Sequence, residues 1–503
     1  MGNLLSTFLS KEKGLRIFYS LLSGILLILS FPPFNFFPFA WAAFIPLFFS
    51  IQNKSRSTAS FLIGVSFFLF LGEFLFPLSL YAWWAWLGAA LYGFLLFTIW
   101  GWMVYPLLNC SRFSLFQVLA VSSAYICLQI FAGLGPLAFP WVDLGYSQWK
   151  FLPIVQITSL IGVNGLSFFI IFCNLLLYWG IKAKKFLFFV LGLLCFFLPT
   201  LFGIVRLQEK ITGKTVTAAL IQTDDHKTFK WSYQDFQNSL IELNHLILKS
   251  KQSHPDLIIL PETAVASYLN ENTAARNLVR SWALKTKTYL IVGTLLKENG
   301  SPKNSLVLVK PNGAWNQKYI KIWLVPFGEY VPDFFKPLKQ FIPVLRNLAN
   351  IKPGKKLGIF HFPEGEFGVM ICYESSFGWI SRKLTLDGAK FLVVSSNDAW
   401  FEKTPAQQIH ASMAVFRAVE NKRSFVQVGN TGISCVINPL GRILLWSQPE
   451  KSEVLIARIP LESGLTVYDF IGRFLSYFWV LGTIVISIFV FAHQGASEHI
   501  TET

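Results

Sequence analysis

Long apolar runs separated by short polar loops fill the first 205 residues. A helix needs about 20 apolar residues to cross a bilayer. Runs near this length predict spans at 15–31, 37–52, 59–79, 84–108, 113–134, 158–181, 186–205 and 470–492. The first two are short and are separated by Pro32 and Pro33, so they also fit a broken or re-entrant pair. The pattern predicts a membrane protein with about eight transmembrane helices.

The pattern changes between residues 206 and 465, where short β-branched runs alternate with helix-like stretches. The strand-like runs begin near residues 216, 256, 289, 367 and 391, and the helix-like stretches cover 232–251, 272–287 and 405–423. This alternation is typical of an α/β layered domain. Turn signals at 311–313, 363–365 and 438–441 indicate antiparallel hairpins. We therefore expect a mixed-sheet sandwich rather than a doubly wound parallel sheet.

These two patterns divide the chain into three parts. A membrane domain with about seven spans is expected at 1–205, and the α/β domain at 206–465. A C-terminal transmembrane helix with a cytoplasmic tail is expected at 466–503.

Composition supports this division. Hydrophobic residues make up 53% of the chain and charged residues only 14%, against about a quarter charged in ordinary soluble proteins. A wholly soluble or disordered chain is therefore excluded. The net charge of +16 is not gathered into one basic face with interleaved aromatics, so nucleic-acid binding is not indicated.

Basic residues in the short loops predict the orientation. Nine of them fall on one side of the predicted spans, and only Lys150 lies in a short loop of the other side. The nine are Lys11, Lys13, Arg16, Lys54, Arg56, Arg112, Lys182, Lys184 and Lys185. The positive-inside rule makes the side with nine charges cytoplasmic. Residues 206–465 are then extracytoplasmic.

Three predicted strand ends of the α/β domain carry reactive side chains. Glu262 follows one buried run, Lys321 lies in a second stretch, and Cys372 ends a third. A thiol, a carboxylate and an ammonium together suit acyl transfer, in which a thiolate attacks a carbonyl and a cation stabilises the oxyanion. A disulfide between Cys372 and Cys435 is the alternative in an oxidising compartment. No Cys/His spacing suggests a metal site, and we expect no cofactor.

The sequence around these residues resembles the nitrilase superfamily. Within it, the closer resemblance is to its membrane-embedded branch, the apolipoprotein N-acyltransferase family. It rests on Leu260-Pro-Glu-Thr-Ala, Leu324-Val-Pro-Phe-Gly-Glu-Tyr-Val-Pro, Ile371-Cys-Tyr-Glu, Ser396-Asn-Asp-Ala-Trp-Phe and Phe139-Pro-Trp-Val-Asp-Leu-Gly-Tyr-Ser-Gln. The resemblance implies an αββα sandwich that carries a Glu-Lys-Cys triad.

The resemblance also implies roles for single residues. Glu262 corresponds to the general base, Cys372 to the nucleophile that becomes a thioester, and Lys321 to the cation at the oxyanion. Supporting positions correspond to Glu329, Tyr373 and Glu374. The expected substrate-binding residues are Trp231, by resemblance, and Phe334, Phe335 and Phe341, in a segment described below.

The implied reaction moves a fatty acyl chain from a membrane phospholipid to the α-amine of S-diacylglyceryl-cysteine at an apolipoprotein N-terminus. The implied location is the bacterial inner membrane, with the catalytic domain facing the periplasm. We expect a monomer whose partners are the phospholipid donor, the diacylglyceryl apolipoprotein acceptor and the bilayer, and no nucleic acid.

The segment 331–346 bears on the substrate, because it mixes large apolar residues with lysines and an arginine. This mixture suits the headgroup boundary of a bilayer; alternatively, the segment covers the core of its own domain. A membrane-tethered nitrilase-type amidohydrolase, in which water replaces the amine, remains the alternative function. A transporter is disfavoured, since the spans show neither an internal repeat nor polar residues at a shared depth.

Overall fold

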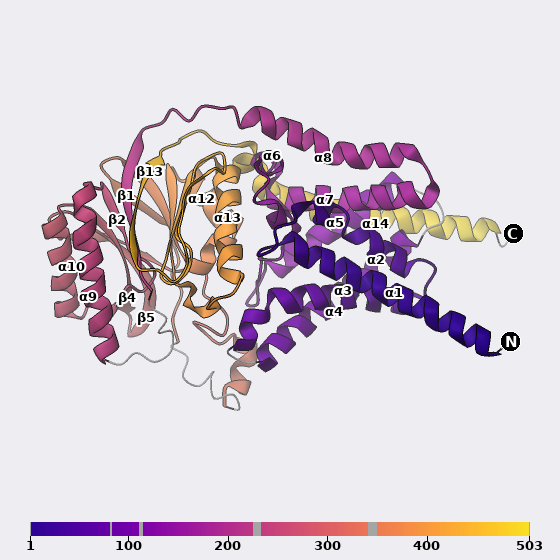
Figure 1. Ribbon diagram of the computed structural model, residues 1–503, viewed down its shortest axis with the longest axis horizontal. Helices are drawn as coiled ribbons and strands as arrows, with labels where there is room; N and C mark the ends of the chain where they lie inside the picture. Colours follow the sequence, from indigo (N-terminus) through magenta and orange to yellow (C-terminus); the bar gives the residue numbers. More distant parts are fainter. Residues whose placement is uncertain (1, 81–82, 110–113, 225–232, 341–349, 502–503) are drawn as a thin grey trace. The chain divides into compact units, whose positions relative to one another are not determined.

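A computed structural model describes residues 2–80, 83–109, 114–224, 233–340 and 350–501. Contacts divide the chain into two compact units. The first consists of Met1–Gly133, Phe139–Leu207 and Ile471–Thr503, and the second of Leu134–Ala138 and Gln208–Phe470. The first unit is helical, whereas the second is built on two β-sheets (Figure 1).

Together with most of α14 (Val467–Thr501), helices of very different length form the first unit. They are α1 (Gly2–Ser30), α2 (Phe44–Ile51), α3 (Arg56–Phe74), α4 (Trp83–Leu108), α5 (Leu115–Ala132), α6 (Leu152–Val155), α7 (Thr158–Ala183) and α8 (Phe186–Arg206), with 3₁₀ turns η1 (Phe37–Trp41), η2 (Phe76–Leu80) and η3 (Leu144–Gln148). Among the described residues, six helices are long and apolar enough to cross a membrane, namely α1 from Glu12 onward, α3, α4, α5, α7 and α8. The prediction of a multi-pass membrane protein is confirmed.

Two of the eight predicted runs fall outside this group. The run 37–52 folds as η1 and the eight-residue α2, a broken apolar segment that is shorter than the six long helices. The Arg16 guanidinium of α1 donates to the Ser50 and Gln52 carbonyls at 2.8 and 2.7 Å, so this segment brings the chain back to the level of Arg16, in agreement with the broken-pair interpretation. The last run lies within α14 (Val467–Thr501).

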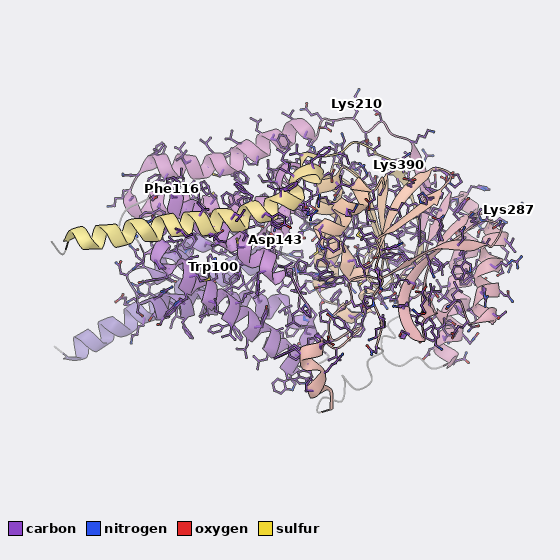
Figure 2. The ribbon with its side chains drawn as sticks, turned by 180° about the vertical axis from the view of Figure 1, so that it is seen from behind. Trp100, Phe116, Asp143, Lys210, Lys287 and Lys390 are labelled. Atoms are coloured by element: carbon purple, nitrogen blue, oxygen red, sulfur yellow. The ribbon has the colours of Figure 1, made fainter. Side chains whose placement is uncertain are left out.

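Large apolar side chains are exposed on the first unit. Phe186, Leu187 and Met103 are 78%, 62% and 62% exposed, and Phe116 also lies on the surface (Figure 2). Lys287, in contrast, is an exposed lysine of the second unit (Figure 2). Exposed apolar patches of this kind indicate an apolar solvent around the helices.

The second unit contains two mixed sheets. The first has the order β13-β1-β2-β4-β5-β6, with β3 also pairing with β4, and the second has the order β12-β11-β10-β9-β8-β7. Their strands are β1 (Thr215–Gln222), β2 (Leu257–Ile259), β3 (Val265–Tyr268), β4 (Tyr289–Glu298), β5 (Ser301–Val309), β6 (Trp315–Ile320), β7 (Gly358–Phe362), β8 (Gly365–Ile371), β9 (Phe391–Ser396), β10 (Ser424–Gly429), β11 (Cys435–Ile437), β12 (Ile443–Trp446) and β13 (Glu453–Pro460). The predicted hairpins are the antiparallel pairs β5–β6, β7–β8 and β11–β12.

Helices cover the outer face of each sheet. The first sheet carries α9 (Tyr233–Ser250) and α10 (Thr273–Thr286), whose apolar faces form one core with β1, β2, β4 and β5. The second carries α12 (Gly378–Leu386) and α13 (Ala406–Asn421) (Figure 1). The order helix, sheet, sheet, helix is the αββα sandwich that the sequence predicted.

The ends of the buried strands position the site. β8 and β9 run parallel with Ile371 opposite Ser395, so Cys372 and Ser396 follow at the same edge. The Ser395 hydroxyl of β9 donates at 2.9 Å to the carbonyl of Leu260, which follows β2 of the first sheet. Leu260 lies two residues before Glu262. Gly293 of β4, in the same sheet as β2, lets the backbone at Pro261 and Glu262 pass close by, because a Cβ there would lie 2.1 Å from the Pro261 carbonyl oxygen.

Candidate active site

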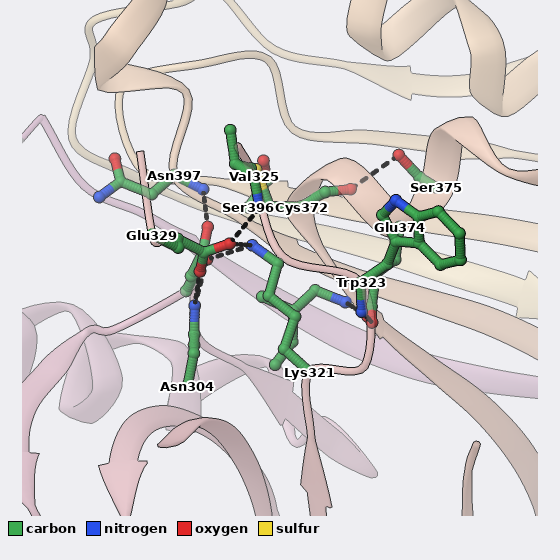
Figure 3. Close-up of polar contacts among 12 residues, drawn as sticks. Asn304, Lys321, Trp323, Val325, Glu329, Cys372, Glu374, Ser375, Ser396 and Asn397 are labelled. Carbon is green, nitrogen blue, oxygen red and sulfur yellow. Dashed lines mark hydrogen bonds and ion pairs between the residues drawn. The ribbon is translucent and has the colours of Figure 1, made fainter. Parts of the chain in front are cut away.

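Lys321 is the centre of the candidate site. It is 1% exposed and follows β6, where its backbone N–H donates to the Asn304 carbonyl of β5 at 2.9 Å. Its ammonium lies 3.2 Å from Glu262 Oε1 and 2.9 Å from Glu329 Oε2 (Figure 3). Two carboxylates from different segments therefore share one buried ammonium.

Two asparagines that no sequence pattern predicts orient these carboxylates. The Asn304 amide donates to Glu262 Oε1 at 2.7 Å and to Glu329 Oε1 at 2.9 Å, and the Asn397 backbone N–H donates to Glu262 Oε2 at 2.8 Å (Figure 3). Asn304 lies inside β5, away from any strand end, so no sequence signal marked it. Asn397 acts here through its backbone, which side-chain patterns do not reveal.

Burial and the neighbouring charges control protonation in this cluster. Burial raises the pKa of Glu262, while the Lys321 ammonium opposes this rise and the Glu329 charge adds to it. Burial alone would lower the pKa of Lys321, but the attraction of Glu262 and Glu329 raises it well above its usual range. Lys321 therefore remains a cation, and Glu262 is a better proton acceptor than an exposed carboxylate.

Cys372 directly follows β8, in a left-handed backbone conformation with φ of 51°. Such a conformation costs a non-glycine residue about 1–3 kcal/mol and often occurs at functional sites. Burial raises the pKa of the thiol well above its usual range, the Glu262 charge adds to the rise, and Lys321 opposes it. The thiol is therefore protonated at rest and needs a base during attack. The charges of Glu262 and Lys321 therefore both act on the Cys372 thiol.

Glu374 ties the loop after Lys321 to the turn that carries Cys372. Its Oε1 accepts from the backbone N–H groups of Ile322 (2.7 Å) and Trp323 (3.0 Å) (Figure 3). Its Oε2 accepts from the backbone N–H of Ile371 (2.8 Å). The Tyr319 hydroxyl donates to the same carboxylate. With its oxygens occupied in this way, Glu374 is a positioning residue rather than a base.

Tyr373 directly follows Cys372, the candidate nucleophile, and its side chain makes contacts of its own. Its hydroxyl donates to the Ala138 carbonyl, and its ring packs edge-on against Phe377 at 5.2 Å between centroids. The Tyr330 hydroxyl donates to the Pro136 carbonyl at 3.1 Å. The short segment Leu134–Ala138, which belongs to this unit, therefore contacts residues beside both Cys372 and Glu329.

The aromatic residues expected to bind substrate lie apart from the buried cluster. Phe334 is 86% exposed in the 3₁₀ turn η5 (Asp333–Gln340), and Phe335 packs edge-on against it and against Phe327. No described contact links Phe334 or Phe335 to Cys372. Trp231 and Phe341 lie outside the described residues.

The alternative disulfide is absent. Cys372 and Cys435 are both free and buried, so the Cys372 thiol is available for chemistry. Among the described residues, no group of three or more His, Cys, Asp or Glu side chains is arranged to hold a metal ion.

Family models match both parts of the chain. Residues 23–176 match the model described as apolipoprotein N-acyltransferase N-terminal domain, and residues 217–466 match the model described as carbon-nitrogen hydrolase. The second match covers the sandwich that holds Glu262, Lys321 and Cys372.

Relatives with similar sequences share one name, apolipoprotein N-acyltransferase. The protein from Geobacter metallireducens is 30% identical, over 94% of this chain and 95% of the relative. Those from Aquifex aeolicus and Haemophilus influenzae are 29% and 27% identical, over 86% and 90% of this chain and 96% and 91% of the relatives. The similarity therefore spans both units.

The role of Glu374 gives a first test. In Glu374→Gln, an NH₂ group replaces an acceptor oxygen, so at least one buried backbone N–H faces another donor, at a cost of about 1–3 kcal/mol. We expect a lower unfolding temperature in detergent and reduced activity. Glu366→Gln is the control, since this carboxylate on β8 is exposed and pairs only with His361 within the described structure. Equal unfolding temperatures for the two variants would contradict the positioning role.

The same residue has a pH signature. Burial raises the pKa of Glu374 to about 7, above that of the unfolded carboxyl, so the folded state binds more protons between these values. The contribution of Glu374 to the free energy of unfolding is fully present below the pKa of the unfolded carboxyl group. It is lost as the pH rises to about 7. Glu374→Gln should lack this component of the pH dependence of unfolding.

Proposed function

The chain belongs to the apolipoprotein N-acyltransferase family, and on that premise we propose that Cys372 carries a fatty acyl chain from a phospholipid to an amine. The observation that carries this proposal is the buried cluster in which Glu262, Lys321 and Cys372 act on one another. The donor is a membrane phospholipid, and the acceptor is the α-amine of S-diacylglyceryl-cysteine at an apolipoprotein N-terminus. The residue roles below follow from the contacts of the cluster.

The first half-reaction makes a thioester. Glu262 takes the Cys372 proton while the sulfur attacks an ester carbonyl, so that a C–S bond forms and the carbonyl electrons move to oxygen. Lys321 and the Tyr373 backbone N–H stabilise this oxyanion. When the intermediate collapses, the ester C–O bond breaks, and the lysophospholipid alkoxide takes the proton from Glu262.

Glu329 serves this step by keeping Lys321 charged. When Glu262 is protonated, it no longer offers a negative charge to the ammonium, but Glu329 remains at 2.9 Å. The Val325 backbone N–H holds the same Glu329 oxygen at 2.8 Å. The cation therefore stays in place when the oxyanion forms.

The second half-reaction transfers the chain. The acceptor amine attacks the thioester carbonyl, Glu262 accepts an amine proton, and the C–S bond breaks with return of that proton to Cys372. The products are an amide and free enzyme, which gives ping-pong kinetics. The alternative amidohydrolase function gains no support, since the membrane part of the chain also matches the acyltransferase family model.

The exposed aromatics support a lipid donor. Phe334 is 86% exposed, and Lys336 lies two residues further on, where it pairs with Asp333 at 2.6 Å. A large apolar group beside an ammonium suits the acyl chain and phosphate of a lipid. Phe334 and Phe335, together with Trp231 and Phe341, are the proposed substrate-binding residues.

The proposed location is the bacterial inner membrane with the catalytic unit in the periplasm. This orientation follows from the basic loops and is tested with single cysteines at two exposed lysines, one on each side. A membrane-impermeant thiol reagent added to spheroplasts should label Lys285→Cys, in α10, and should label Lys185→Cys, before α8, only after lysis. The reverse labelling pattern would overturn the orientation.

Mass spectrometry tests the proposed nucleophile. Purified protein incubated with phosphatidylethanolamine in detergent micelles should gain the mass of one fatty acyl group on Cys372, and lysophospholipid should appear. Cys372→Ala should gain none, because no thiolate remains at the cluster. Cys435→Ala is the matched control, since it removes the other buried free thiol of this unit and should keep the adduct. Activity that survives in Cys372→Ala would sink the proposal.

A further inference from the structure

A chain of four buried polar side chains lies beside Cys372, and neither the triad nor its supporting residues include it. Asp398, His410, Ser375 and Ser396 are each at most 2% exposed. Asp398 Oδ1 lies 2.9 Å from His410 Nδ1 and accepts from the Ser396 hydroxyl at 2.7 Å. His410 Nε2 lies 2.8 Å from the Ser375 hydroxyl. That hydroxyl donates to the Cys372 carbonyl at 2.9 Å (Figure 3).

The positions of the hydrogen atoms that link these four side chains can be assigned from their contacts. A carbonyl oxygen only accepts, so the single Ser375 hydroxyl proton points to the Cys372 carbonyl. His410 Nε2 must then donate to the Ser375 oxygen, and Nδ1 must donate to the Asp398 carboxylate. A histidine that donates from both ring nitrogens is an imidazolium.

The charge of Asp398 leads to the same assignment. This carboxylate is completely buried, and its Oδ2 has no hydrogen-bond partner among the described residues. The Gly432 backbone packs against this oxygen, because a Cβ there would lie 2.3 Å from it. A buried carboxylate is costly unless a cation accompanies it. His410 is the cation that the described ion pairs provide for Asp398.

We propose that Asp398, His410 and Ser375 form a positioning relay in which an imidazolium on His410 fixes the peptide between Cys372 and Tyr373. The peptide is planar, with its C=O and N–H pointing in opposite directions. By holding the Cys372 carbonyl, Ser375 therefore sets the direction of the Tyr373 N–H toward the oxyanion. This inference rests on the proposed role of Cys372 as nucleophile.

The relay makes a kinetic prediction that separates it from a merely structural contact. Ser375→Ala removes the link to the carbonyl and should slow Cys372 acylation at saturating phosphatidylethanolamine by about 10- to 100-fold, since losing one oxyanion donor outright costs about 10²- to 10³-fold. KM should stay unchanged. Ser376→Ala is the matched control, because the neighbouring serine is equally buried and its hydroxyl has no partner in the described structure. Its rate should remain within about twofold of wild type.

The proton assignment has a readout that does not depend on activity. In the full-length protein labelled with ¹⁵N-histidine, His410 should show two protonated ring nitrogens at neutral pH, and the signal is assigned by its loss in His410→Gln. Asp398→Asn should convert it to a neutral imidazole, since the paired charge is gone. Equal acylation rates for the two serine variants, or a neutral His410 in the wild type, would overturn the proposal. If the wild type forms no acyl adduct, the proposed function fails instead, and the nitrogen signals still decide the state of the relay.

Discussion

One buried ammonium, shared by two carboxylates, is the constraint on which the rest of the site depends. Lys321 is 1% exposed, and a charge removed from water in this way must be compensated by nearby opposite charge. Glu262 and Glu329 supply this compensation at 3.2 and 2.9 Å. Because the two acids are held by the same cation, a proton can be added to Glu262 without losing the charge that stabilises an oxyanion. The electrostatics therefore permit both proton transfer and oxyanion stabilisation within one cluster.

The sandwich topology makes this cluster possible. Glu262 follows a strand of one sheet and Cys372 a strand of the other, and the Ser395 to Leu260 hydrogen bond joins the sheets at that point. Glu374 then links the turn after Cys372 to the loop after Lys321 through backbone N–H groups. These contacts hold together the turn after β8, the loop after β6 and the segment before Glu262.

Features that depend on neighbouring residues could be predicted from the sequence. The buried strand runs before Glu262 and Cys372 predicted a sandwich with reactive residues at the strand ends, and the turn residues predicted the hairpins. Asn304 and His410 escaped prediction because each lies inside an element, and only pairing across the fold brings them to the site. The run 37–52 was ambiguous because its composition suits a membrane, while its prolines limit helix length. Composition thus indicates whether a segment faces lipid or water, whereas its contacts depend on residues that are distant in the sequence.

The passage of the acyl chain from Cys372 to an amine can be followed in the second half-reaction alone. Acyl-enzyme freed of phospholipid is mixed with a synthetic S-diacylglyceryl-cysteinyl peptide, and both species are weighed by mass spectrometry over time. We expect the adduct to leave Cys372 as the peptide gains one acyl group, whereas an N-acetylated peptide should gain none and leave the adduct intact. Loss of the adduct to free fatty acid at the same rate with either peptide would contradict this transfer.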